Sequence, residues 1–120
     1  MDFKITNGKH LDHFKLMKTF ISKILSFKKT TDRLSYLKKI TRREIDYVSE
    51  IVLNFLKNKI HFAYREFSKL KKIKNFMREF VKNKKAYKIK KRLILSVKGL
   101  YLLNVLLPLA SKTLDSFNLV

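Results

Sequence analysis

The chain contains only two glycines and one proline in 120 residues. Its apolar residues recur every three or four positions over most of the length, the spacing that gathers them on one side of an α-helix. Sheets and irregular folds need turn-forming residues in larger numbers. The sequence therefore predicts an all-α fold, a small bundle of about five helices with a basic face and an apolar C-terminal helix.

The expected helices span about 10–27, a short stretch around 34–40, then 42–57, 63–81 and 86–96. The clearest boundary signal is a capping box between Thr41 and Glu44, whose side chains can satisfy free backbone donors at the start of a helix. Asn58 is expected to end the third helix. Gly99 is expected to break the chain after the fifth helix, and Pro108 to kink or end any helix beyond it.

Charge is distributed very unevenly along this pattern. The stretch from Lys57 to Lys98 holds sixteen Lys and Arg residues against two acids, Glu66 and Glu79, and the whole chain carries a net charge of +20. A one-sided excess predicts a polyanionic partner, either nucleic acid or an anionic membrane. The alternative is a solvated helix face, and AT-rich coding would also favour lysine, but neither explains the scarcity of acids.

The density of cations favours a nucleic acid, either DNA or RNA, because clustered cations release the counterions condensed on phosphates. Lysine outnumbers arginine 23 to 6. Lysine is a flexible point charge, whereas arginine offers a fork to guanine edges, so binding to the phosphate backbone without reading of sequence is expected. Tyr87 could stack on a base, but a lone aromatic residue at helical spacing more often belongs to a core. The expected nucleic-acid-binding residues are Lys69, Lys71, Lys72, Lys74, Arg78, Lys82, Lys84, Lys85, Lys88, Lys90, Lys91 and Arg92.

From Leu100 to Ala110 only Asn104 is polar. This run is shorter than the roughly 20 residues needed to span a bilayer, so it is a buried core helix, an interfacial anchor or a protein contact. The N-terminus has no uninterrupted apolar segment, and no signal peptide is expected. The chain thus divides into an amphipathic helix at 1–30, a basic core at 31–98 and an apolar tail at 99–120. The tail residues expected to contact a membrane or a partner are Leu100, Tyr101, Leu103, Leu106 and Leu107.

Catalytic and metal-binding signals are weak. His10 and His13 could share a helix face, but the chain has three histidines and no cysteine to complete a closed metal shell. The acids fit a cap and helix-face pairing with Lys and Arg better than a catalytic pair. No nucleophile elbow or phosphate-cradling loop is present. We therefore expect no enzyme activity, no metal and no cofactor.

Several features occur in a recognisable order. They are the phrase Leu53-Asn54-Phe55-Leu56-Lys57-Asn58-Lys59-Ile60, the basic stretch from Ser68 to Lys74, Lys90-Lys91-Arg92-Leu93-Ile94, then Lys98-Gly99 and Leu106-Leu107-Pro108-Leu109. In this order and spacing, about Arg33 to Ala110 resembles the small basic virion core proteins related to adenoviral core protein ten, encoded by Polinton-type elements and adintoviruses. That family usually has a Gly-Gly-Phe step where this chain has Gly99-Leu100-Tyr101, so a processing site or hinge there does not carry over.

The resemblance implies a non-enzymatic viral or virus-derived protein that compacts double-stranded DNA inside a capsid, located in the virion or the host nucleus. It also implies that the apolar tail contacts capsid, another protein or a membrane during entry. Two other functions fit the residues themselves. One is a membrane-active basic protein, and the other is a helical module that binds an acidic protein. Self-association through the tail is compatible with each of the three.

Overall fold

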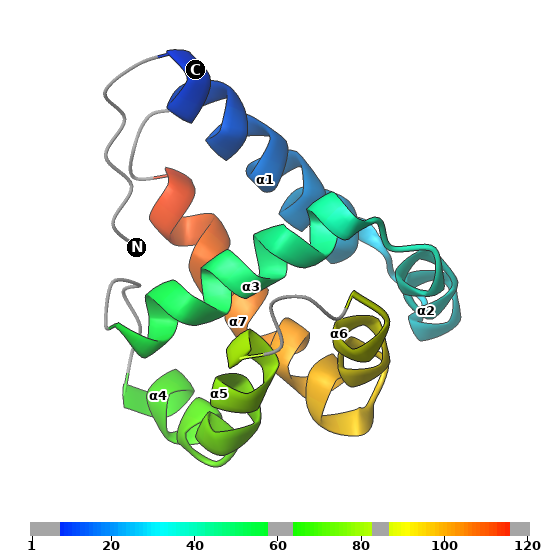
Figure 1. The fold of residues 1–120 in the computed structure, drawn as a ribbon, viewed down its shortest axis with the longest axis vertical. Helices are drawn as coiled ribbons and strands as arrows, with labels where there is room; N and C mark the ends of the chain where they lie inside the picture. The colour runs from blue at the N-terminus through cyan, green and yellow to red at the C-terminus, as the bar shows by residue number, and fades with distance from the viewer. Residues whose placement is uncertain (1–7, 58–63, 83–86, 116–120) are drawn as a thin grey trace.

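The structure is a computed structural model that describes the backbone of residues 8–57, 64–82 and 87–115 and the side chains of 12–57, 68–82 and 87–115. These ranges form seven α-helices and no strand, which confirms the predicted all-α fold (Figure 1). The helices are more numerous than the five expected. They are α1 (Gly8–Ser26), α2 (Thr30–Lys38), α3 (Arg42–Leu56), α4 (Tyr64–Lys71), α5 (Lys74–Lys82), α6 (Tyr87–Ile94) and α7 (Val97–Asp115).

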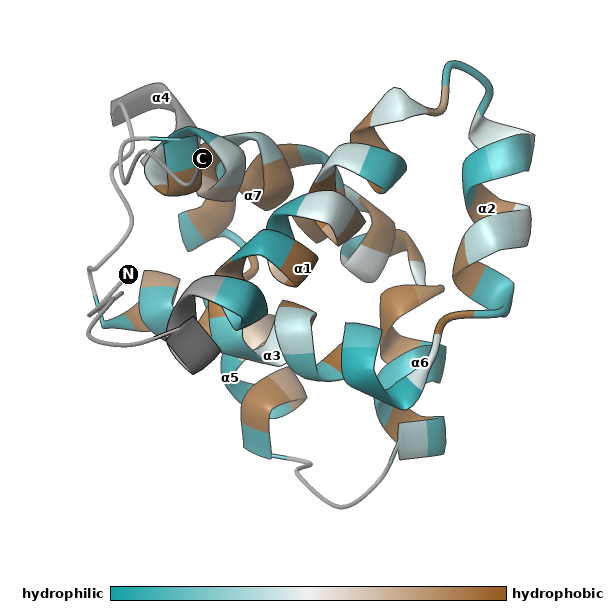
Figure 2. Ribbon diagram, turned by 90° about the horizontal axis from the view of Figure 1, so that it is seen from above, coloured by the Kyte–Doolittle hydropathy of each residue, from teal (hydrophilic) through white to brown (hydrophobic). Residues whose placement is uncertain are grey.

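Two helices organise the core. α7 lies against α1, α3, α4 and α6, and α3 also lies against α1, α5 and α6. Brown apolar and teal polar residues alternate along the turns of most helices in Figure 2, because each helix buries one side only. Buried residues come from each of the three sequence segments, including Met17, Ile51 and Leu106, so 1–30, 31–98 and 99–120 share one core.

The start of α3 follows the predicted capping box. Thr41 Oγ1 accepts a hydrogen bond from Glu44 N at 3.1 Å, and Thr41 N donates to Glu44 Oε1 at 2.9 Å. Glu44 Oε2 also accepts from the Tyr36 hydroxyl at 2.5 Å, which ties α2 to the cap. α3 ends at Leu56, close to the expected boundary, while Asn58 lies outside the described residues.

The prediction of one helix over 63–81 is wrong, because the chain turns between α4 and α5. Ile73 N donates to Leu70 O at 3.0 Å, and Met77 N then donates to Ile73 O at 2.9 Å as α5 begins. Ile73 is buried at this turn. No glycine or proline marks the position, so the turn is imposed by packing of Leu70, Ile73 and Met77 into the core.

The predicted break at Gly99 is wrong, and Pro108 does not end the helix that contains it. The break between α6 and α7, which are bent by 80°, falls at Leu95 and Ser96, and Gly99 lies in the first turn of α7. Ser96 Oγ accepts from Gly99 N at 3.1 Å and so caps the new helix. α7 runs through Pro108 to Asp115, with the loss of one backbone donor inside the helix.

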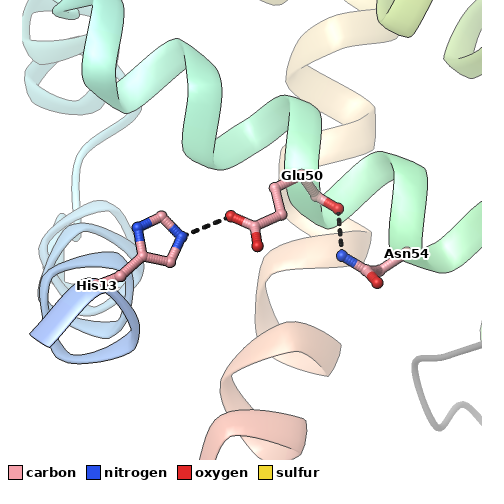
Figure 3. A network of polar contacts seen from close by, with 3 residues as sticks. All are labelled: His13, Glu50 and Asn54. Atoms are coloured by element: carbon pink, nitrogen blue, oxygen red, sulfur yellow. Dashed lines mark hydrogen bonds and ion pairs between the residues drawn. The ribbon is translucent and has the colours of Figure 1, made fainter. Parts of the chain in front are cut away.

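Polar contacts between side chains fix how the outer helices dock. His13 Nε2 lies 2.7 Å from Glu50 Oε2 and joins α1 to α3, and Asn54 Nδ2 donates to Glu50 O at 2.8 Å (Figure 3). Lys18 pairs with Asp115, joining α1 to α7. The apolar sides of the helices supply most of the packing, and these polar contacts set the relative orientation of the helices.

Candidate nucleic-acid interface

The cations of α4 and α5 lie opposite the buried sides of these helices. Leu70, Met77 and Phe80 are buried, and their burial turns the opposite side of each helix towards solvent. Glu79 is the one acid in this pair of helices whose side chain is described, and it is exposed. The cations placed outside are Lys69, Lys71, Lys72, Arg78 and Lys82, with Lys74 half-buried at the edge.

On α6 the exposed cations are Lys88 and Arg92, one helical turn apart. Lys91 is half-buried, and Ile89 is exposed. Lys84 and Lys85 lie outside the described residues. In Figure 1, α4, α5 and α6 lie along the lower side of the molecule, and α1 runs across the upper side.

Lys90 departs from its predicted place on the surface. Only 5% of the residue is exposed, its Nζ donates to Ser49 Oγ at 2.8 Å, and it lies 5.3 Å from the centre of the Phe80 ring. α6 turns Lys90 and Ile94 towards α3 and α5, so the aliphatic stem of the lysine fills a core position that a leucine would normally take. A phosphate therefore cannot reach Lys90 in this fold.

Tyr87 brings α6 to the start of α3. Its hydroxyl donates a hydrogen bond to Ile40 O, which pins the half-buried ring. Arg42 Cζ lies 5.5 Å from the ring centre and Lys91 Nζ lies 6.0 Å from it. These cation–π contacts favour the use of the ring as a support for two cations over its use as a stacking platform.

Arg42 was not among the residues expected at the interface. It precedes Tyr87 by 45 positions, and nothing in the local pattern links the two. The structure therefore adds Arg42, which is exposed in the first turn of α3, to the cations of α6.

The apolar tail residues take part in the core instead of facing a membrane or a partner. Leu103, Leu106 and Leu107 are buried, and Leu100 and Tyr101 are half-buried. This follows from the position of α7 among α1, α3, α4 and α6. In the described ranges no single helix is both long and apolar enough to cross a membrane, whereas the bent pair of α6 and α7 has the length and composition to do so together.

The described side chains do not assemble a group of three His, Asp or Glu residues that could hold a metal ion. His13 is engaged with Glu50, and the side chain of His10 is outside the described set. Comparisons with protein-family models, curated proteins and solved structures gave no match.

Proposed function

We propose that this chain is a non-enzymatic protein that binds and condenses nucleic acid, with double-stranded DNA as its partner, without reading sequence. The proposal rests on one observation: α4, α5 and α6 each bury an apolar side and expose cations on the other side. Described apolar residues of these helices, such as Leu70, Phe80 and Ile94, are buried in a shared core, and most described lysines and arginines are exposed outside it. Glu79 is the one exposed acid among the described side chains of the three helices, and it does little to offset their charge. Such a surface neutralises phosphates and releases their counterions.

The kind of cation supports contact with the phosphate backbone. Among the described side chains of α4, α5 and α6, lysine predominates over arginine in the exposed cations, and the exposed arginines are Arg78 and Arg92. Arg42, the further arginine near α6, lies over the Tyr87 ring. Flexible ammonium groups adapt to phosphates in many positions, so affinity should depend weakly on base composition.

Condensation follows if one molecule contacts two duplexes. The cations belong to separate helices, α4 with α5 and α6 with Arg42 of α3, and residues 69 to 92 would bridge neighbouring duplex segments. The resemblance of 33–110 to small basic virion core proteins supports placing this activity in a virion or a host nucleus.

The test is binding of the purified chain to random duplex DNA at several salt concentrations. If six to ten phosphates are contacted, the logarithm of the affinity should fall linearly with the logarithm of the salt concentration, with a slope of about −0.9 per phosphate. A shallow dependence would contradict the proposal. Binding to anionic vesicles in the same buffers without binding to DNA would favour the membrane-active alternative, which requires α7 to leave the core.

Paired variants locate the surface. Lys71→Gln with Lys72→Gln removes two exposed cations between α4 and α5, and Lys15→Gln with Lys23→Gln removes two exposed cations of α1. The first pair should reduce the magnitude of the salt slope by up to about 1.8, that is 0.9 for each lost contact, and the second should change it little. Equal effects from both pairs would mean that charge anywhere on the molecule suffices.

A further inference from the structure

A groove with two adjoining hollows runs between α1 and the start of α3, on a part of the molecule that the proposed function does not use. One hollow, here called the acidic hollow, has a volume of about 450 Å³ and is lined by Asp12, His13, Leu16, Arg43, Asp46 and Tyr47. The other, the basic hollow, has a volume of about 570 Å³ and includes Leu16, Phe20, Lys23, Tyr36, Lys39 and Arg43 in its lining. Leu16, Arg43 and Tyr47 line both hollows, so they form one continuous groove.

The middle of the groove is apolar and partly open to solvent. Leu16 is 49% exposed, although it belongs to a helix whose neighbouring residues Met17 and Phe20 are buried. Tyr47 and Phe20 are almost fully buried and their rings lie 5.9 Å apart, so they form a firm base beneath the groove. An exposed leucine over such a base leaves apolar surface that a partner could cover.

Charge is arranged along the groove by sign. Lys23 and Lys39 line the basic hollow alone, Asp12 and Asp46 line the acidic hollow alone, and Arg43 lies between them. Glu44 also lines the basic hollow, where its carboxylate is bonded to Thr41 N and to the Tyr36 hydroxyl. Lys23, Lys39 and Arg43 outnumber this one acid, so the hollow keeps an excess of positive charge.

These features distinguish between possible occupants. A duplex or single-stranded nucleic acid is negative along its whole length and would be repelled by Asp12 and Asp46. The Phe20 and Tyr47 rings are buried and cannot stack on its bases. A second copy of this chain has 29 basic and nine acidic residues and has little negative charge to place over Lys23 and Lys39.

We infer that the groove between α1 and α3 binds an acidic amphipathic segment of another protein, with apolar side chains on Leu16 and acids over the basic hollow. A helix with leucines three and four positions apart presents the required apolar stripe. Basic groups at the other end of the same segment would face Asp12 and Asp46. The charge order of the groove therefore fixes the direction in which the segment lies.

The experiment uses a synthetic helical peptide of about 14 residues, or four turns, labelled with a fluorophore. It carries leucines along one side, glutamates at one end and lysines at the other. Its control has the same composition with the leucines spread around the helix. Fluorescence anisotropy with the full chain should show tighter binding of the first peptide, and the difference should persist at moderate salt, where unspecific attraction to a protein of net charge +20 weakens.

Variants of the protein connect this binding to the groove. Leu16→Ser should weaken it by about tenfold, since it removes the apolar contact. Lys39→Glu should weaken it further than Lys98→Glu, which changes the net charge equally at an exposed position on α7. Circular dichroism establishes that each variant is folded, and the affinity of Leu16→Ser for DNA should be unchanged.

Three outcomes would overturn the inference. The first is equal binding of the two peptides, and the second is unchanged peptide affinity in folded Leu16→Ser. The third is an effect of Leu16→Ser on DNA binding or on self-association, measured by sedimentation, without an effect on the peptide. Each outcome is separable from the salt-dependence test, because loss of DNA binding by the native chain would leave the peptide comparison intact.

Discussion

Gly99 occupies the point where the first turn of α7 meets the last turn of α6. A Cβ at this position would lie 2.5 Å from Ile94 O and closer still to Leu93 O, and both atoms are backbone. The glycine is thus needed for a close approach of two helices, although its place in the sequence, between a basic and an apolar stretch, predicts a helix break. The actual break is made by Ser96, whose hydroxyl caps α7.

Replacement of this glycine should show whether steric crowding or helix propensity dominates at this position. Gly99→Ala is expected to lower the free energy of unfolding by about 1–3 kcal/mol, because the added methyl group has no room. In an open helix position the same change would stabilise by up to about 1 kcal/mol through helix propensity. Urea denaturation measures the difference, with the exposed Lys98→Ala as the control. A gain in stability for Gly99→Ala would contradict the close approach.

Another single residue, Tyr36, should make the stability of the fold depend on pH. Burial of the ring, with the hydrogen bond to Glu44 and the charge of that carboxylate, raises the pKa of Tyr36 to about 12. The unfolded chain would ionise this group near pH 10. A raised pKa favours the neutral phenol in the folded state, so its contribution to stability is complete below pH 10 and is lost as the pH rises from 10 to 12.

Tyr36→Phe should remove that contribution. Between pH 10 and 12 the free energy of unfolding should fall more for the native protein than for the variant, as measured by denaturation at each pH. Lysine titration affects both proteins equally, so it cancels when the two are compared. Tyr101→Phe, at another half-buried tyrosine, provides the matched comparison. Parallel stability curves for native protein and Tyr36→Phe would show that the bond to Glu44 does not hold the phenol neutral.

At the scale of whole elements, the sequence predicts helices where the signal is local. The capping box at Thr41 and the apolar stripe of α3 lie within a few residues of each other, and both are found as expected. The turn at Ile73 is different, because Leu70, Ile73, Met77 and Phe80 keep a helical spacing straight through it. Only the fold shows that α4 packs on α7 while α5 packs on α3.

In the candidate interface, too, local features can be predicted from the sequence and non-local contacts cannot. Exposure of Lys71, Arg78 or Lys88 could be predicted from helical spacing, because each lies off an apolar stripe. Burial of Lys90 could not, since it depends on Ser49 and Phe80 from two other helices. Non-local contacts of this kind decide which cations of a uniformly basic segment remain available.

Pro108 provides a test within one element. It is exposed inside α7, where it removes the backbone donor that would reach Asn104 O and where its ring crowds that carbonyl. Pro108→Ala should therefore raise the free energy of unfolding, by up to about 3 kcal/mol. Thermal melts followed by circular dichroism measure this, with Lys112→Ala on the same helix as the control. A loss of stability would show that Pro108 itself contributes to the packing of α7.

For the molecule as a whole, charge repulsion is the dominant electrostatic effect. Nine acids can pair directly with at most nine of the 29 cations, which leaves twenty cations in a body with a radius of gyration of 13.7 Å. The Debye length is about 10 Å at 0.1 M salt, comparable to that radius, so moderate salt should screen much of the repulsion. The melting temperature should accordingly rise with sodium chloride concentration up to about 0.5 M.

A bound polyanion should relieve the same repulsion more strongly than salt, because it binds the folded surface and leaves its counterions behind. At a free DNA concentration about 100 times Kd, linkage adds about 2.7 kcal/mol to the stability of the folded chain. Duplex DNA at low salt should therefore raise the melting temperature by several degrees, and the increase should vanish at high salt, where the free protein is already screened. The Leu16→Ser variant should show the same increase, since its groove lies apart from the cations of α4, α5 and α6. If DNA lowers the melting temperature instead, the polymer prefers the unfolded chain, and the arrangement of cations on the folded helices is not what binds it.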